Sequence, residues 1–241
     1  MRWIYISPHL DDAVLSCGGL IWEQRRAGTP VEIWTLTAGY PSAEPYSGLA
    51  RALHAQWGFA SAREAVQARR REDRLAAQRL GAVTRHFDFL DCIYRLDGRG
   101  RHLYEDVFVP PHPEDTDLPT KITKALTPYL GREDVLVSPL AIGGHVDHVL
   151  VRRAVERLRR SVWYYADIPY LLAHPESLPT VTSDMSEERF RVSGTGLRAW
   201  QEGIAAYASQ IAVLFESEAL MREAIHRYWS EYGGVRLWRN E

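Results

Sequence analysis

The feature that most constrains the fold of this chain is a regular alternation of short apolar segments and longer amphipathic ones over its first 170 residues. Short runs rich in β-branched and aromatic residues predict strands, and the polar, periodic segments between them predict helices. The predicted strands are 3–7, 31–37, 83–89, 134–138 and 162–166, and the predicted helices are 18–28, 62–81, about 119–130 and 145–160. Strands joined in this way by helices form a mostly parallel sheet that is covered on both faces, so we expect a Rossmann-like, three-layer α/β fold.

The pattern changes after residue 169. Residues 173–186 contain several Pro, Ser and Thr, and they are followed by two helical stretches near 197–215 and 217–231 and by a tail that suits a strand. We therefore expect one domain over 1–241, with an α/β core at 1–169 and a helical C-terminal extension at 170–241. The segments 38–62 and 95–119 are rich in Gly, Pro, Ser or Asp, which predicts irregular loops, and we expect them to form the walls of a cleft.

Composition removes several classes of function. The 29 basic and 31 acidic residues give a net charge of −2, which provides no general attraction to nucleic acid or to an anionic membrane. The only lysines are Lys121 and Lys124, neither in a Gly-Lys-Ser/Thr phosphate loop, and no apolar run is long enough to span a membrane. Two cysteines and an N-terminus without the features of a signal peptide predict a cytoplasmic protein.

Two polar segments follow predicted strands. Pro8-His9-Leu10-Asp11-Asp12 follows the first strand, and Gly143-Gly144-His145-Val146-Asp147-His148 follows the fourth. Because ligands bind beyond the carboxyl ends of parallel strands, both segments are expected at one edge of the sheet. Taken alone, each segment also suits a helix start with a capping acid or with surface histidines. Taken together, they offer a His, Asp and His set for catalytic zinc, with one carboxylate and one histidine left over for a base and a hydrogen-bond donor.

These two motifs, PHLDD and SPLAIGGHVDH, resemble those of the LmbE-like or PIG-L family of zinc-dependent N-acetyl-sugar deacetylases. The resemblance implies that His9, Asp12 and His148 bind one Zn²⁺ and that Asp11 is the general base. It implies that His145 stabilises the transition state and is a candidate acid, and that Asp147 tunes His145. Leu10, Ala13 and Val146 depart from the residues usual in the family, so they leave the subgroup and its substrate open.

Weaker matches to the family suggest contacts with the substrate. Arg69, with Glu72, matches an Arg-x-x-Glu pattern, and Asp91 matches an acid that binds a substrate hydroxyl, although the arginine cluster also suits a solvated helix face. Tyr207-Ala208-Ser209-Gln210 matches a Tyr-x-Ser-Gln element. The implied reaction is removal of the acetyl group from an N-acetylglucosamine-type amino sugar or its conjugate, by attack of zinc-bound water on the amide carbonyl with Asp11 as base.

Other functions stay open at this point. A metal-dependent hydrolase could act on another amide or ester, or on a phosphoester. A nucleotide-binding α/β module could use Gly18-Gly19 at the start of a helix, although the spaced Gly-x-Gly-x-x-Gly pattern is missing. The expected partner is a small N-acetylated amino-sugar substrate, and the sequence leaves a homo-oligomer open.

Overall fold

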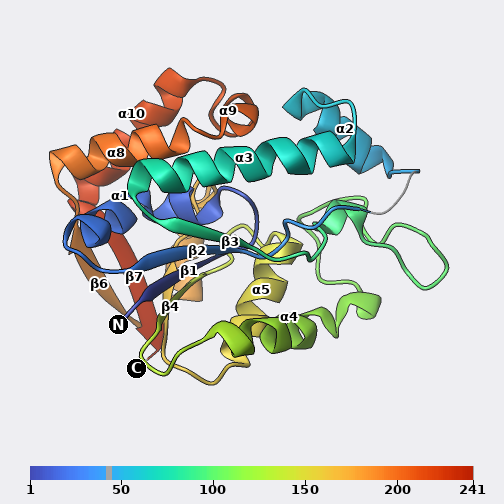
Figure 1. The fold of residues 1–241 in the computed structure, drawn as a ribbon, viewed down its shortest axis with the longest axis horizontal. Coiled ribbons are helices and arrows are strands. Elements are labelled where there is room, and N and C mark those ends of the chain that lie inside the picture. The colour runs from blue at the N-terminus through green and yellow to red at the C-terminus, as the bar shows by residue number, and fades with distance from the viewer. Residues whose placement is uncertain (42–44, 241) are drawn as a thin grey trace.

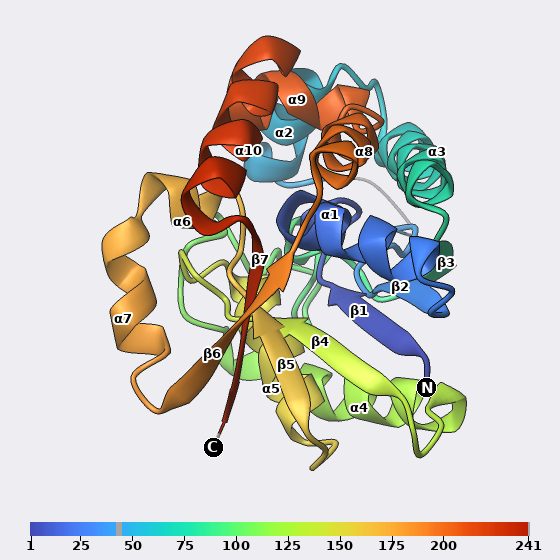
Figure 2. The same ribbon diagram turned by 90° about the vertical axis from the view of Figure 1, so that its left-hand side faces the viewer.

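The computed structural model describes residues 1–41 and 45–240 and contains a seven-stranded sheet in the order β3-β2-β1-β4-β5-β7-β6 (Figures 1 and 2). Five strands are parallel: β1 (Trp3–Ser7), β2 (Val31–Thr35), β3 (Val83–His86), β4 (Val135–Pro139) and β5 (Val162–Tyr165). At one edge, β7 (Gly234–Asn240) runs antiparallel to both β5 and β6 (Met185–Arg191). The predicted fold class, a mostly parallel sheet, is confirmed.

Helices cover both faces of this sheet (Figure 1). One face carries α1 (Asp12–Arg26), α3 (Ala62–Leu80) and α8 (Gly194–Ile204), which pack against one another. The opposite face carries α4 (Leu118–Leu126) and α5 (Val146–Glu156), which also pack together. The remaining helices are α2 (Gly48–Trp57), α6 (Tyr170–Ala173), α7 (Leu178–Val181), α9 (Ala208–Phe215) and α10 (Glu218–Tyr232).

Helix α3 shows why the clearest prediction was accurate. The side chain of Ser61 accepts a hydrogen bond from the Glu64 N–H, and the Glu64 carboxylate accepts one from the Ala60 N–H, so the first turn is capped from both sides. Gly81 follows the helix with φ of 73°, the left-handed conformation that glycine adopts without strain. Both signals are local, and they delimit the helix at the predicted residues.

The predicted start of the first helix, residue 18, was wrong. Helix α1 begins at Asp12, and its first ten residues are all buried, so they show no amphipathic period that would mark a helix. Gly18 and Gly19 lie in the middle of this helix, where a Cβ on Gly18 would be 2.5 Å from the Trp200 ring. These glycines therefore allow α8 to pack closely on α1, which rules out their use as a phosphate-binding turn.

The structure corrects two further expectations. Segment 38–62, expected to be irregular, contains α2, which Ser47 caps at its start and Gly58 ends in the left-handed conformation. The C-terminal extension supplies two strands to the sheet: β7 is the strand expected in the tail, and β6 was not expected. Most of β6 is exposed at the sheet edge, so its sequence lacks the apolar alternation of a half-buried strand. The pairing of β7 with β5 supports our proposal that 1–241 forms one domain.

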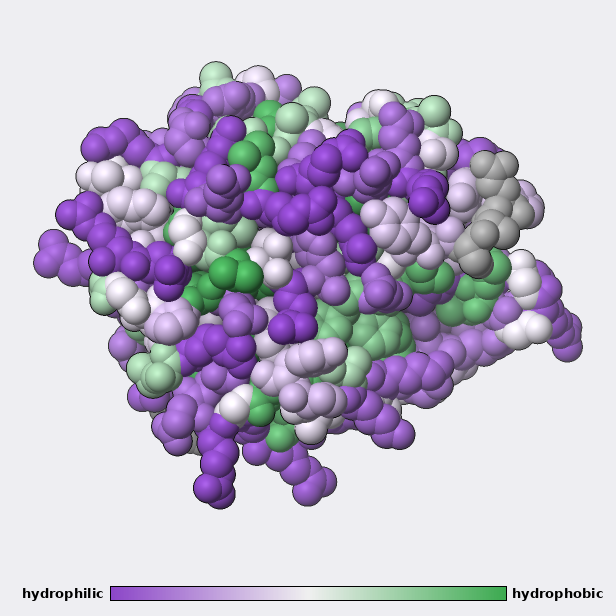
Figure 3. Space-filling model, in the orientation of Figure 1, coloured by the Kyte–Doolittle hydropathy of each residue, from purple (hydrophilic) through white to green (hydrophobic). Residues whose placement is uncertain are grey.

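The surface is mostly hydrophilic in the view of Figure 3, and hydrophobic residues appear there in small groups. Large apolar side chains such as Trp34, Trp200 and Tyr5 are fully buried instead. Among the described helices, none combines the length and the apolar character needed to cross a membrane.

Candidate active site and metal centre

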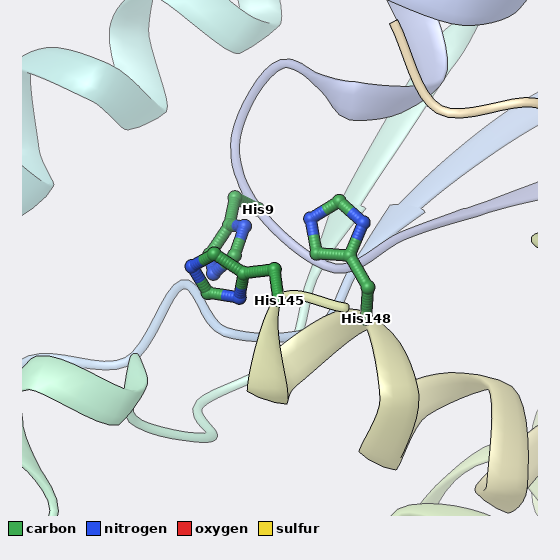
Figure 4. A group of neighbouring side chains, drawn as sticks. All are labelled: His9, His145 and His148. Atoms are coloured by element: carbon green, nitrogen blue, oxygen red, sulfur yellow. The ribbon is translucent and has the colours of Figure 1, made fainter. Parts of the chain in front are cut away.

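The two polar segments meet at the carboxyl edge of the sheet, where β1 and β4 are neighbours. His9 and Asp11 lie in the loop after β1, and Asp12 is the first residue of α1. His145 is the N-cap of α5, and His148 lies in its first turn. Figure 4 shows the three imidazole rings grouped where the loop after β1 faces the start of α5. All of these side chains are at least nine-tenths buried.

The turn before α5 depends on two glycines. Gly143 and Gly144 have φ values of 85° and 72°, which residues other than glycine rarely adopt. The Cβ of Gly143 would also lie 3.1 Å from Tyr170. This turn leads from β4 into α5, and the rings of His145 and His148 lie 4.7 Å and 5.3 Å from the ring of His9, in the loop after β1.

His9 and His148 each direct one ring nitrogen at the Asp12 carboxylate, at a different oxygen of it. Nδ1 of His9 lies 3.4 Å from Asp12 Oδ2, and Nε2 of His148 lies 3.4 Å from Asp12 Oδ1. Tetrahedral zinc, with bonds of ~2.0–2.1 Å, brings its ligand atoms to about 3.4 Å from one another. Nε2 of His148 is buried and has no hydrogen-bond partner among the described residues. A bound metal ion would satisfy this nitrogen by accepting its lone pair. The donor set therefore fits a divalent metal such as zinc.

Carboxylates hold the other nitrogen of both histidines. Nε2 of His9 lies 3.0 Å from Asp147 Oδ2, and Nδ1 of His148 lies 2.7 Å from Asp167 Oδ1. Carboxylates that accept from ligating imidazoles in this way fix the tautomer, so that the remaining nitrogen is free to bind metal. Asp167 follows β5 as Asp11 follows β1, but the sequence analysis did not single it out. The rule for strand ends would have found it.

Asp147 contacts both histidine segments of the site, through its carboxylate and through its backbone. Its side chain accepts from His9, from Arg95 Nη1 at 2.5 Å and from the Cys92 N–H at 2.9 Å. Only its backbone N–H reaches His145, at Nδ1. Burial alone would raise the pKa of Asp147, but Arg95 and His9 outweigh it and hold that pKa well below the usual range. The Asp147 carboxylate therefore hydrogen-bonds His9, while its charge also acts to raise the pKa of His145, and the tuning of His145 stays a prediction.

The surroundings of His145 disfavour the protonated imidazole. Burial, together with the neighbouring His9 and His148, puts its pKa well below the ordinary value. Its Nδ1 accepts the Asp147 N–H at 3.2 Å, so the proton of the neutral ring lies on Nε2. The same three histidines place ligand nitrogens within 4.8 Å of one another, so His145 is also close enough to a metal to act on what binds there.

Asp11 has the character of a base. Burial raises the pKa of Asp11 to about 6, and the Arg69 guanidinium opposes that rise. Nη2 of Arg69 lies 3.3 Å from Asp11 Oδ2, and its guanidinium lies 4.7 Å over the ring of Trp57. A buried carboxylate with a pKa close to neutral suits proton transfer.

The cleft that contains these groups encloses about 330 Å³. Arg69 and Asp91 line this cleft, as do the other predicted site residues except Asp147 and His148. Those two residues do not line it but contact His9, which does. Oδ2 of Asp91 lies 3.8 Å from His9 Nε2. Gln210 and Tyr170 line the cleft as well; the Tyr-x-Ser-Gln match was the only sequence signal for Gln210. Glu72 lies outside and binds Ser209.

Comparison with known proteins agrees with this geometry. The family model described as "PIG-L: GlcNAc-PI de-N-acetylase" matches residues 4–158. A 2'-N-acetylparomamine deacetylase of Niallia circulans is 29% identical, with 98% of this chain and 93% of the relative covered. A second deacetylase of that name, from Streptomyces fradiae, is 32% identical over 70% of this chain and 57% of its own length.

Solved structures agree as well. The zinc-inhibited form of teicoplanin deacetylase Orf2 is similar with a TM-score of 0.84 and 29% identity, covering 99% of this chain and 97% of that one. The antimicrobial reagent A40926 pseudoaglycone deacetylase Dbv21 has a TM-score of 0.76 and 30% identity, covering 99% and 96%. This chain therefore belongs to the PIG-L family of deacetylases.

Proposed function

We propose that this protein is a metal-dependent N-deacetylase that removes the acetyl group from an N-acetylglucosamine-type amino sugar or its conjugate. The observation that carries the proposal is the pair of buried histidines, each held by a carboxylate on one nitrogen and facing Asp12 with the other. Relatives named as deacetylases of acetylated antibiotics support the same reaction class. We further propose a cytoplasmic enzyme, since Cys17 and Cys92 are buried free thiols.

His9, Asp12 and His148 would hold one zinc ion. A zinc ion bound there supplies Lewis acidity toward the amide carbonyl and acidifies water at the site. The backing carboxylates of Asp147 and Asp167 keep both imidazoles in the tautomer that can bind it.

Asp11 takes the proton of the attacking water. The water oxygen forms a bond to the carbonyl carbon, and the carbon–nitrogen bond then breaks to release acetate and a free amine. Asp11 accepts one proton in the first step and is placed to return it to the amine nitrogen in the second. Arg69 holds the carboxylate in position through its ion pair.

His145 stabilises the negative charge that develops on the carbonyl oxygen. Its Nδ1 accepts the Asp147 N–H, which leaves Nε2–H as the donor, and His145 lines the cleft. Donors aimed at such an oxyanion are typically worth ~3–4 kcal/mol of transition-state stabilisation.

The proposal is tested by assaying N-acetylglucosaminides for both free amine and acetate, with zinc removed and restored. We expect activity only with the metal. Asp11→Asn should keep zinc but lose ~10²–10⁴-fold in rate, whereas His148→Ala should lose zinc as well. Release of amine by metal-free enzyme, or turnover only of esters or phosphoesters, would contradict the proposal.

A further inference from the structure

The wall of the cleft is divided by chemistry. At its inner end lie the polar groups that surround the candidate metal site. Apart from the buried Leu15 and Ile93, the apolar lining residues are partly or largely exposed and so form the outer wall: Leu53, Trp57, Val107, Phe108, Pro169, Tyr170, Val213 and Leu214. They come from α2, from α9, from the segment between β3 and α4 and from the start of α6, and Gln210 of α9 adds a single amide among them.

Several of these side chains are exposed to solvent. Phe108 is 53% exposed and Val213 is 39% exposed, although both are apolar. Phe108 is nevertheless fixed, because its ring packs edge-on against His145 at 5.8 Å and against Tyr170 at 5.7 Å. The Val107 carbonyl also accepts the Val146 N–H, which ties this loop to α5. An ordered, exposed apolar surface next to a reaction centre is characteristic of a ligand site.

The positions of the charged residues in the cleft decide whether its outer wall can bind a cationic ligand or an uncharged one. The carboxylates that line the cleft are Asp11, Asp12 and Asp91, all at the inner end. Asp11 is paired with Arg69, and the other two lie beside His9. No described residue of the outer wall is acidic, and the Arg69 guanidinium lies over the ring of Trp57, so an ammonium group placed there would lose water without gaining an acidic partner.

We propose that the outer part of the cleft is a subsite for an uncharged aromatic or aliphatic aglycone attached to the N-acetylated sugar. The inference rests on the proposed function, because the acetamide must reach the inner end and the rest of the substrate then lies along the outer wall. It names the substrate class: a conjugate with an apolar group, rather than an aminoglycoside with free amines.

The test compares kcat/KM for three substrates: phenyl N-acetylglucosaminide, the corresponding methyl glycoside, and 2'-N-acetylparomamine. We expect the phenyl glycoside to exceed the methyl glycoside by about tenfold or more, chiefly through KM, as burial of a ring requires. Val213→Asp should remove most of that preference and improve the cationic substrate relative to the phenyl one. Val83→Asp, at an exposed valine on β3 that is not in the cleft lining, should keep the preference.

Equal kcat/KM for the phenyl and methyl glycosides, or wild-type preference for the cationic substrate, would overturn the subsite. Calorimetric binding of phenyl and methyl glucosaminide, the products of the reaction, gives the same comparison without turnover. Failure of all three substrates to release acetate would count against the proposed function. Tighter binding of the phenyl compound would then still support the subsite, and equal binding would reject it.

Discussion

Asp11 and Arg69 make the clearest case for how one side chain sets the chemistry of another. Burial raises the pKa of the carboxyl, and the guanidinium, 3.3 Å away, lowers it again. The active base is the deprotonated form, so activity falls as pH drops through this pKa. Any change that removes the positive charge must therefore raise the pKa and move the acid limb of the pH–rate profile.

We predict that Arg69→Gln shifts the acid limb of kcat/KM to higher pH than in the wild type. Arg70→Gln is the matched control, because Arg70 is the next residue on α3 but pairs with the exposed Asp88. It should leave the limb in place. The pH dependence of kcat/KM from pH 5 to 9 measures both, and an unchanged or lower limb in Arg69→Gln would show that the guanidinium does not act on the base.

Asp147 shows which contacts of a site residue the sequence does not reveal. The resemblance implies that it tunes His145, two residues away, and the structure adds a contact of its carboxylate with His9, 138 positions away. Arg95 contacts it and also Asp115, and no local pattern marks Arg95 as part of the site. Only the tertiary structure defines such partners, whereas the strand-end rule was sufficient for His9, Asp11, Asp12 and the two histidines of α5.

Loss of the buried ion pair between Arg95 and Asp147 should weaken metal binding. We predict that Arg95→Met lowers zinc affinity about 10–100-fold, the usual cost of disturbing the groups behind a metal ligand. Arg236→Met removes an arginine that is equally buried but lies on β7, near Glu187 and Tyr232, and it should not change zinc affinity. Chelator competition measures the affinity directly, and an equal loss in both variants would mean that the effect of Arg95 is only structural.

The turn between β4 and α5 is the element on which the histidine pair depends. Left-handed backbone costs an alanine ~1–2 kcal/mol, and the sequence marks this turn through its paired glycines. The elements that the sequence did not reveal lack such marks. The start of α1 is buried all round, and β6 is a polar edge strand.

We predict that Gly144→Ala lowers the free energy of unfolding by ~1–2 kcal/mol through the left-handed backbone conformation. No steric cost is added, because a Cβ there has nothing within 4 Å. Gly143→Ala should cost more, because its Cβ would also press on Tyr170. Urea denaturation of both variants gives the two values. The reverse order would contradict the packing described for this turn.

For the molecule as a whole, the C-terminal segment completes the sheet and covers one of its faces. Trp200 of α8 is fully buried on Gly18, and its indole N–H donates to the Val14 carbonyl of α1. We predict that Trp200→Ala lowers the free energy of unfolding by ~3–5 kcal/mol.

We also predict that the wild type unfolds in a single calorimetric transition, as one domain requires. Two separate transitions would divide the chain into independent units.

The most direct measurement is an anomalous diffraction map of zinc-loaded crystals at the zinc absorption edge. The account predicts one strong peak within bonding distance of His9 Nδ1, an Asp12 carboxylate oxygen and His148 Nε2, which disappears in His148→Ala and persists in Asp11→Asn. A map without a peak between these three side chains, or a peak bound by Asp11, would contradict it.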